Sequence, residues 1–517
     1  MFEQHFPVLP IILPLIAAPL CMLLGRSQLA WLLATIVSGI SFCMAAALLV
    51  MTLDQGVLSY ALGGWEAPWG IEMRLDVANA LVLSVVTGIS TLVLVYAKAS
   101  VAKEIPVNQH TLFYTAHLMC LAGLSGILTT GDAFNLFVFL EISSLATYTL
   151  VSLASDRRAL TAAFRYLVMG TIGATFILIG VGMMYMKTGT LNMLDLAALI
   201  GEYDYNRTLN TGLAFILIGV CIKLALFPLH MWLPPAYTHA PSAVSAFLAS
   251  TATKVAVYVM IRFIFTIYGA EYVFYRMGMD VILLVLAIVA IFNCSYVATV
   301  QSNVKTMLAY SSVAQIGYMI LGISLVTAAG LMAGLLHIFN HALMKGALFM
   351  AVGAVFYRTG SVDIKAFRGL GKTMPWTMAA FTIAGLSIIG VPLTAGFVSK
   401  WYLVTAALEQ QHWVIAFLVL IGSLLAVVYI GRILEAAYFK EAVEPVSEKT
   451  IKEAPLMMLV PMWILVLANI YFGIDTSLSV TAADAAANWL FEPGAQSAAQ
   501  AVSQTSAQAA SEMGAAR

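Results

Sequence analysis

Long apolar stretches separated by short polar connections occupy almost the whole chain. A transmembrane helix needs about 20 mostly apolar residues, and by this measure the sequence predicts about fourteen spans. Their approximate limits are 7–25, 30–52, 76–98, 112–131, 133–153, 162–186, 209–227, 243–267, 280–300, 303–325, 330–357, 376–394 continuing to 408, 413–437 and 455–474. Residues 53–75 are too polar and rich in glycine to cross a membrane, and we expect a surface hairpin there. The pattern predicts an all-α integral membrane protein.

Two of the predicted spans carry helix-breaking residues close to a lysine. In the seventh, Lys223 is followed by Pro228, which lacks an N–H and clashes with the carbonyl four residues earlier. In the twelfth, Pro392 interrupts the segment GLSIIGVPLTAGFVSKW before Lys400. Interrupted helices at corresponding points of two halves are typical of repeat transporters. Because the two spans are five apart, their orientations are opposite, which predicts two inverted five-helix repeats, spans four to eight and nine to thirteen, each containing a broken helix.

This layout divides the chain into four regions. Residues 1–110 form N-terminal transmembrane helices, and residues 111–410 form a core that contains the repeats and extends to about 437. Residues 411–474 supply the C-terminal transmembrane helices. Residues 475–517 are rich in Ala, Ser and Gln, a composition that predicts a mostly disordered tail.

Composition agrees with a membrane protein and excludes several function classes. Hydrophobic residues make up 62% of the chain and charged residues 10%, whereas soluble domains carry roughly 25% charged residues. The formal net charge is zero and there is no basic tract, so we expect no nucleic-acid partner. The five cysteines are scattered singly and no C-x-x-C occurs, so we expect no iron–sulfur cluster, structural zinc, disulfide framework or other cofactor.

Charge near the ends of the spans predicts the orientation. The first apolar run follows an acidic start, MFEQHFP, which indicates a retained span, since cleaved signal peptides begin with a basic segment. Cytoplasmic loops carry an excess of Lys and Arg. With the N-terminus outside, 15 of the 25 Lys and Arg residues fall on the inner side, 6 on the outer side and 4 inside spans. The sequence therefore predicts a multi-pass protein of the cell inner (plasma) membrane, with both termini on the outer, periplasmic side.

Charged and titratable side chains lie inside several predicted spans. They are Glu141, Lys223, Lys254, His337, His341, Lys345 and Lys400. Each charge at membrane depth costs at least a few kcal/mol, and such residues usually mark ion pathways or pair with one another. Glu141 is the only deep acid of the first half, so we expect it to pair with Lys223. A structural role in joining helices remains the competing interpretation for any single residue.

The spacing of three of these residues favours proton transfer. His337, His341 and Lys345 recur every fourth residue, so they share one helix face with about 6 Å of rise between neighbours. Water between them could complete a chain of groups that exchange protons, and histidine titrates near neutral pH. Two histidines at this spacing could also bind zinc, but the next group is a lysine rather than a third ligand. A haem would need an axial histidine that no second span offers.

Five motifs together resemble one known family. They are GDAFNLFVFLE, KLALFPLHMWLPPAYTHAPSAVSAFLAS, TKVAVYVMIR, HIFNHALMKGALFM and GVPLTAGFVSKW, in this order over residues 110–405. The chain resembles the antiporter-like membrane subunits of respiratory complex I, membrane-bound hydrogenases and Mrp-type Na⁺/H⁺ antiporters, and most closely the Mrp D-type subunit. The resemblance implies a proton-switching pair at Glu141 and Lys223 and a central lysine at Lys254. It also implies that His337, His341 and Lys345 form a connecting axis and that Lys400 is the terminal lysine.

The expected function is therefore that of a proton-conducting subunit in a multi-subunit monovalent cation (Na⁺)/H⁺ antiporter, with other membrane subunits as partners. The alternative is the proton-pumping subunit of a redox-driven complex, of the NADH-quinone oxidoreductase or membrane-bound hydrogenase type. The complex I subunit with a long lateral helix is disfavoured because the chain has no such extension. The complex I subunit with a glutamate in the broken twelfth span is disfavoured by Lys400. A stand-alone solute transporter is also disfavoured, because the charges lie along a line and do not surround one pocket. The sequence shows no redox or hydrolytic site, so any electron chemistry would lie in partner subunits.

Overall fold

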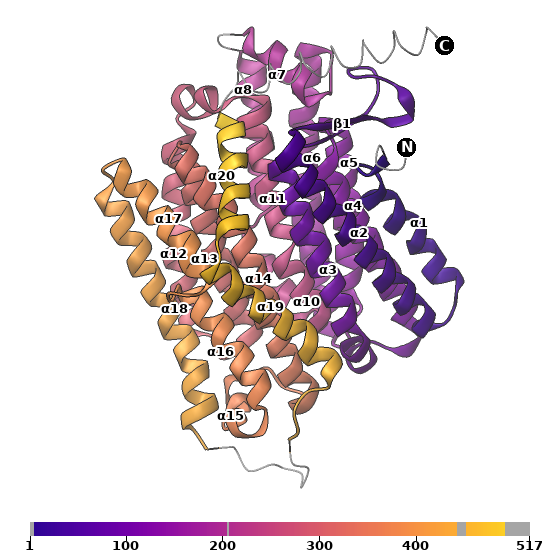
Figure 1. Ribbon diagram of the computed structural model, residues 1–517, viewed down its shortest axis with the longest axis vertical. Helices are drawn as coiled ribbons and strands as arrows, with labels where there is room; N and C mark the ends of the chain where they lie inside the picture. Colours follow the sequence, from indigo (N-terminus) through magenta and orange to yellow (C-terminus); the bar gives the residue numbers. More distant parts are fainter. Residues whose placement is uncertain (1–4, 204–205, 442–450, 492–517) are drawn as a thin grey trace.

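The computed structural model describes residues 5–203, 206–441 and 451–491, which form a helix bundle with one small hairpin at its surface (Figure 1). The N-terminal part comprises α1 Leu9–Leu23, α2 Ser27–Gln55, β1 Leu58–Ala61, η2 Leu62–Gly64, β2 Glu72–Leu75 and α3 Val77–Glu104. Strands β1 and β2 are antiparallel, with Leu58 opposite Leu75. The hairpin expected within residues 53–75 is confirmed.

The middle of the chain contains the elements of the two repeats. The first part comprises η3 Val107–Gln109, α4 His110–Thr129, α5 Ala133–Ser152, α6 Arg157–Thr188, α7 Met193–Gly201, α8 Arg207–Lys223, α9 Leu233–His239, α10 Ser242–Ser250, α11 Ala252–Ile261, η4 Arg262–Ile267 and η5 Tyr272–Arg276. The second comprises α12 Met279–Val300, α13 Val304–Ser324, α14 Ala328–Thr359, η6 Ile364–Phe367, α15 Leu370–Thr373, α16 Pro375–Ile389, α17 Ala395–Glu409 and α18 Trp413–Phe439. The C-terminal helices are α19 Leu456–Ile474 and α20 Ser477–Phe491.

The number of membrane spans agrees with the sequence pattern. Within the described ranges, eleven helical segments are long and apolar enough to cross a membrane. The shorter α1 and the two interrupted pairs, α8–α9 and α16–α17, occupy the positions of the other three predicted spans. Together they match the fourteen predicted spans, so the prediction of an all-α membrane protein is confirmed.

The same local structure occurs twice and identifies the repeats. In the first, Ala133 N donates to Leu191 O and Met193 N to Gly131 O. In the second, Val304 N donates to Val362 O and Ile364 N to Ser302 O. Each residue of the first pair of bonds has a counterpart 171 positions later in the second pair: 133 and 304, 191 and 362, 193 and 364, and 131 and 302. The two pairs of hydrogen bonds are therefore equivalent. The preceding long helices α6 and α14 also both end at a left-handed glycine, Gly189 and Gly360.

The two copies are inverted relative to each other. The short helix α7, which follows the first copy, lies at the top of Figure 1, whereas α15, which follows the second, lies at the bottom. Each copy contains the broken span that its proline predicts. Helix α8 ends at Lys223, and Pro228 follows in the break before α9. Helix α16 ends at Ile389, and Pro392 lies in the break before α17.

The eighth span differs from the prediction, because it is not one continuous helix over 243–267. It is interrupted at Thr251, whose φ of −124° and ψ of −64° are not helical, and it ends in the π-helical turn η4. Proline is the usual sign of an interruption, and this segment has none between Pro241 and Ile267. The third break therefore has no simple sequence signal.

The C-terminal tail also differs from the prediction. The expectation of disorder from residue 475 onward is wrong for Ser477–Phe491, which form α20, while 492–517 lie outside the described residues. The alanines of α20 are the reason, since small side chains let the helix lie close against its neighbours. Ala482 is fully buried in a cluster with Leu49, Ala80 and Leu81. Helix α20 thus packs against both α3 and α14 (Figure 1).

Helix α14 lies at the centre of the bundle. It contacts α3, α10, α13, α16, α17, α19 and α20. In its most apolar segment, 94% of the residues are buried. In the corresponding segments of α2, α6, α12 and α18 only 39% are buried, so these helices face outward. The histidines and lysine of α14 therefore lie in the interior of the protein.

Candidate functional site

The first deep charge pair forms where α8 breaks. Lys223 is the last residue of α8, and its Nζ lies 3.3 Å from Glu141 Oε1 of α5. The same Nζ donates a 2.8 Å hydrogen bond to Ser144 Oγ, one turn after Glu141. The lysine side chain is only 8% exposed, whereas that of Glu141 is 26% exposed. The structure therefore brings together the two residues that the sequence pairs, and it adds Ser144 as a third member.

A small cavity lies beside Lys223 and reaches α11. It has a volume of about 40 Å³ and is lined by Ser143, Ser144, Thr147 and Tyr166, among others. Ala252 and Val255 of α11 form the opposite wall. A cavity needs roughly 10–15 Å³ to hold one water molecule, so this one accommodates more than one. Water there would connect Lys223 with the helix that carries Lys254.

Glu141 lies on an outward-facing side of α5. Phe134, Val138 and Leu145 on the same helix are all exposed. A carboxylate that faces lipid at membrane depth is costly, so this face is suited to contact with another protein. The position of Glu141 thus fits a subunit of a larger membrane complex better than a protein surrounded by lipid.

Lys254 lies directly after the interruption of the eighth span and is fully buried. Its Nζ donates to the carbonyl oxygen of Ala249, in the last turn of α10, and more weakly to Thr253 Oγ1 at 3.4 Å. Carbonyls in the last turn of a helix have no partner within that helix. The interruption at Thr251 therefore supplies an acceptor for the lysine, although no carboxylate among the described residues pairs with it.

Lys400 has the same kind of environment at the break of the twelfth span. Its Nζ donates to Ile388 O at 2.7 Å and to Ile389 O at 3.1 Å, the last carbonyls of α16. It also lies 5.0 Å from the ring centre of Tyr318. Two of the deep lysines are thus held by carbonyls that an interrupted helix leaves free.

The three predicted residues of α14 line one face of that helix. The rings of His337 and His341 are nearly parallel, with their centres 5.9 Å apart. His337 bonds to Ser399 Oγ at 2.8 Å and to Gln315 Oε1 at 3.0 Å, so both of its ring nitrogens are occupied. Ser399 precedes Lys400 in α17, and this contact joins the α14 face to the terminal lysine. The zinc alternative is disfavoured because His337 has no nitrogen left for a metal.

His341 and Lys345 continue this face toward α10 and α13. Lys345 Nζ donates to Leu308 O at 2.8 Å and to Ser311 Oγ at 3.0 Å. Among the described residues, neither ring nitrogen of His341 has a hydrogen-bond partner, and the same is true of Ser250 Oγ. Buried polar groups are nearly always satisfied by protein or ordered water, so this part of the interior is suited to hold water.

The structure thus places the seven candidate residues in two connected groups. One contains Glu141, Lys223 and the adjoining cavity, and the other runs from Lys345 through the histidines to Lys400. Lys254 lies between them on α11. The sequence does not single out Ser144, Gln315 or Ser399. Their only signal is a position next to a candidate or on the same helix face, and serine and glutamine at such positions are too common to identify.

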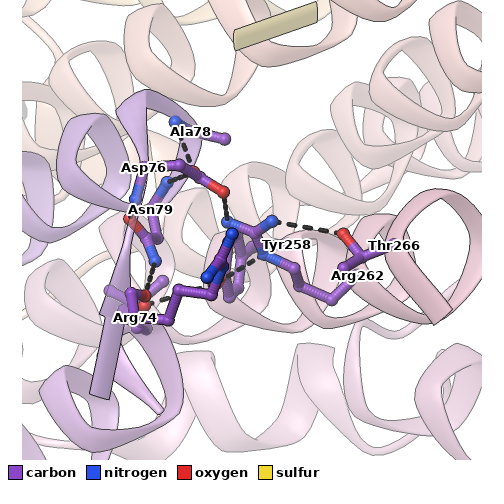
Figure 2. Close-up of polar contacts among 8 residues, drawn as sticks. Arg74, Asp76, Ala78, Asn79, Tyr258, Arg262 and Thr266 are labelled. Carbon is purple, nitrogen blue, oxygen red and sulfur yellow. Dashed lines mark hydrogen bonds and ion pairs between the residues drawn. The ribbon is translucent and has the colours of Figure 1, made fainter. Parts of the chain in front are cut away.

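A further buried charge is also missed by the sequence. The charge count along the chain assigns Arg262 to the outer side, near the end of the predicted span 243–267. In the structure it is only 6% exposed and forms an ion pair with Asp76, at 2.5 Å between Nη2 and Oδ2 (Figure 2). The error arises because Arg262 stands near the end of an apolar stretch, where a positive charge usually marks a loop. Its partner lies 186 residues earlier in the sequence, so the sequence gives no sign of the pairing.

His239, beyond the break in the seventh span, has its contacts with surface charges. At the end of α9, His239 Nδ1 lies 3.9 Å from Asp156 Oδ2 at a surface where Arg158 also pairs with Asp156. Hydrogen bonds from Arg158 lower the pKa of Asp156. His239 thus belongs to a cluster of charged groups at the surface, away from the α14 face.

Comparison with known proteins identifies the family. Residues 130–426 match the family model described as NADH:quinone oxidoreductase/Mrp antiporter, TM. The chain is 40% identical to NADH-quinone oxidoreductase subunit N of Desulforudis audaxviator, over 91% of this chain and 96% of that protein. It is 30% identical to the D subunit of the Na(+)/H(+) antiporter of Alkalihalophilus pseudofirmus, over 89% of this chain and 92% of that protein. Relatives of both kinds are therefore similar over nearly their full length.

Two solved structures share the fold. The Mrp complex from Dietzia sp. DQ12-45-1b contains a chain with a TM-score of 0.87 and 25% identity, covering 96% of this chain and 99% of that one. The membrane-bound sulfane sulfur reductase, an archaeal respiratory membrane complex, contains one with a TM-score of 0.86 and 30% identity, covering 95% and 98%. The resemblance seen in the motifs is confirmed: this multi-pass protein is a proton-translocating type of subunit and belongs to the NADH:quinone oxidoreductase/Mrp antiporter family of transmembrane subunits.

Proposed function

We propose that this chain is the proton-conducting subunit of a multi-subunit Na⁺/H⁺ antiporter in the plasma membrane, with both termini on the outer side. The observation that carries the proposal is the pair Glu141–Lys223, which lies on an outward-facing helix and adjoins a buried series of lysines and histidines. The similarity to the D subunit of Na(+)/H(+) antiporters over most of both chains supports the choice of antiporter.

In the proposed mechanism, Glu141 controls the charge of Lys223. While the two side chains lie 3.3 Å apart, the carboxylate stabilises the ammonium group. When a cation approaches Glu141 from a neighbouring subunit, it competes for the carboxylate, and Lys223 then releases its proton more readily. Water in the adjoining cavity accepts that proton and passes it toward Lys254.

The remaining residues would carry protons through the second half. Lys254 and Lys400 are each held by backbone carbonyls, which accept hydrogen bonds from an ammonium or a neutral amine alike. His341, with two unpaired ring nitrogens among the described residues, can take a proton on one nitrogen and release one from the other. His337 and Ser399 then connect this position with Lys400.

A direct test uses the native complex, purified through a tag on this chain and reconstituted in liposomes with a trapped pH-sensitive dye. A Na⁺ gradient should drive proton movement in the parent complex, and Lys223→Ala or Glu141→Ala should abolish it while the subunits still assemble. Lys187→Ala is a matched control, because Lys187 is an exposed lysine remote from the axis. Retained transport in either axis variant would overturn the assignment.

A second candidate is the proton-pumping subunit of a redox-driven complex. The observation that favours it is the 40% identity to an NADH-quinone oxidoreductase subunit N. The two functions are separated by measuring flavin and iron–sulfur absorbance in the purified native complex and by asking what drives proton movement. Proton movement driven by electron transfer to a quinone, and not by Na⁺, would replace the antiporter proposal by this one.

A further inference from the structure

A buried network of charges lies between the surface hairpin and Lys254. Arg262 stands at the start of the π-helical turn η4, two helical turns after Lys254 in sequence, so about 12 Å separates them along the helix axis. Its Nη2 contacts Asp76 Oδ2 at 2.5 Å, its Nε donates to Tyr258 Oη at 2.7 Å and its Nη1 to Thr266 Oγ1 at 3.2 Å. Figure 2 shows the guanidinium group reaching Asp76 at the start of α3.

Only one oxygen of Asp76 can exchange partners. Oδ1 caps α3 and accepts hydrogen bonds from the backbone of Ala78 and Asn79 at 2.9 and 3.2 Å. Oδ2 has Arg262 as its partner. The carboxylate is therefore fixed in place by the helix, while its second oxygen becomes available whenever Arg262 moves. Arg262 could move without losing every partner, because Tyr258 and Thr266 remain as acceptors on its own helical segment.

The pair also adjoins a small cavity and, on the hairpin side, a second pair of charges. The cavity has a volume of about 20 Å³ and is lined by Asp76, Arg262, Tyr258, Thr266 and Arg74, among others. That volume holds one water molecule. On the hairpin side the charges continue, since Arg74 Nη1 lies 3.5 Å from Glu72 Oε1 in β2. Charges of alternating sign thus connect the hairpin with the segment that carries Lys254.

We propose that Asp76 is a further ion-transfer carboxylate at the hairpin end of the protein. Arg262 acts as its latch: while the two side chains are paired, Oδ2 is closed to ions. The proposal rests on the proposed function, because it gives protons a way between Lys254 and the hairpin face. π-Helical turns occur frequently at functional sites, and η4 begins at the latch residue itself.

The transfer conserves atoms and charge. When Arg262 releases Oδ2, an N–H bond of protonated Lys254 breaks, and the proton passes through water to form an O–H bond at Asp76 Oδ2. The proton then leaves to water at the hairpin face, which restores the carboxylate, and Arg262 pairs with it again. With Arg262 in place, Oδ2 accepts neither a proton nor a monovalent cation, and the route is closed.

The test measures passive proton entry into liposomes that contain the reconstituted native complex. A potassium diffusion potential drives the protons, and no Na⁺ is present. Arg262→Gln should increase the leak about tenfold, because Asp76 Oδ2 loses its charged partner and can then take up a proton from water. Asp76→Asn should show no increase in passive proton leak and should lose coupled transport, because the carboxylate is gone. The protein should still fold, since asparagine also caps α3. The double variant should be as tight as Asp76→Asn, because the leak of Arg262→Gln requires the carboxylate.

Matched variants keep the result interpretable. Lys187→Gln removes an exposed positive charge remote from this network, and it should not increase the proton leak. Arg262→Lys keeps the charge and should leak less than Arg262→Gln, and it serves if Arg262→Gln fails to assemble. The proposal is overturned if Arg262→Gln is tight, if the double variant leaks as much as Arg262→Gln, or if Asp76→Asn transports normally. A leak in Arg262→Gln without Na⁺-coupled transport in the parent complex would support the latch and refute the antiporter function instead.

Discussion

Replacing Glu141 by glutamine removes the charge beside Lys223 while keeping the shape of the side chain. At 3.3 Å and an effective dielectric constant of 20, the attraction between the two charges is about 5 kcal/mol. The carboxylate is 26% exposed, so screening by water reduces this value, and about 2 kcal/mol is a reasonable remainder. Loss of that stabilisation corresponds to a roughly 30-fold change in the protonation equilibrium of Lys223.

We therefore expect Glu141→Gln to lower the initial rate of Na⁺-driven proton movement by about 30-fold. The assay is dye-reported proton flux in liposomes containing equal amounts of assembled complex. Glu141→Asp, which retains the charge at a longer distance from Lys223, should keep a substantial part of the rate. Ser144→Ala loses only the 2.8 Å hydrogen bond to Lys223 and should slow transport by roughly fivefold. A fully active and fully assembled Glu141→Gln complex would refute the role of the pair.

Three further changes test the axis and the packing around it. Ser399→Ala removes the 2.8 Å bond to His337 and should reduce proton flux by roughly fivefold with normal assembly, as measured in the same liposomes; an unchanged rate would argue against this connection. Gly353→Val should lower the thermal midpoint of the purified complex, because a Cβ there collides with Tyr96 and Ser242, and overpacking costs about 1–3 kcal/mol. Ala482→Asp buries a carboxylate in the apolar cluster beneath α20 and should destabilise the protein by about 3 kcal/mol or more; an unchanged melting curve would show that α20 is not docked.

The features that sequence predicts well are those with a strong local cause. Apolar length alone determines the spans, because backbone polar groups in lipid must be satisfied within a helix. Pro228 and Pro392 mark two breaks because proline removes a donor and clashes with the preceding turn. The shared face of His337, His341 and Lys345 follows from helical geometry, and the structure shows the two histidine rings nearly parallel.

The features that sequence misses depend on distant contacts. The break at Thr251 has no proline, and its consequence, the carbonyl of Ala249 turned to Lys254, appears only in three dimensions. Arg262 and Asp76 meet across 186 residues. The composition of α20 predicts disorder wrongly, because an alanine-rich segment can be either a flexible tail or a helix that packs closely.

One weak sequence signal points to the repeat length. The segments TGTLN at 188–192 and TGSVD at 359–363 occupy equivalent positions of the two repeats. Each supplies a left-handed glycine after a long helix, α6 or α14, and a carbonyl that accepts a hydrogen bond from the first residue of α5 or α13. Five residues of partial identity are too few to establish a repeat alone, but their separation by 171 residues gives its length.

The central claim, that protons cross the interior along the buried lysines and histidines, is tested most directly at Lys254. This side chain is fully buried between the two groups of candidate residues, and methionine has a similar length without a titratable group. The measurement is Na⁺-driven proton flux through the reconstituted complex with Lys254→Met, beside a control complex with Lys365→Met, which changes an exposed lysine. Proton flux should disappear in Lys254→Met and remain normal in the control, with the same subunits in both complexes. Undiminished flux through Lys254→Met would contradict the proposed route.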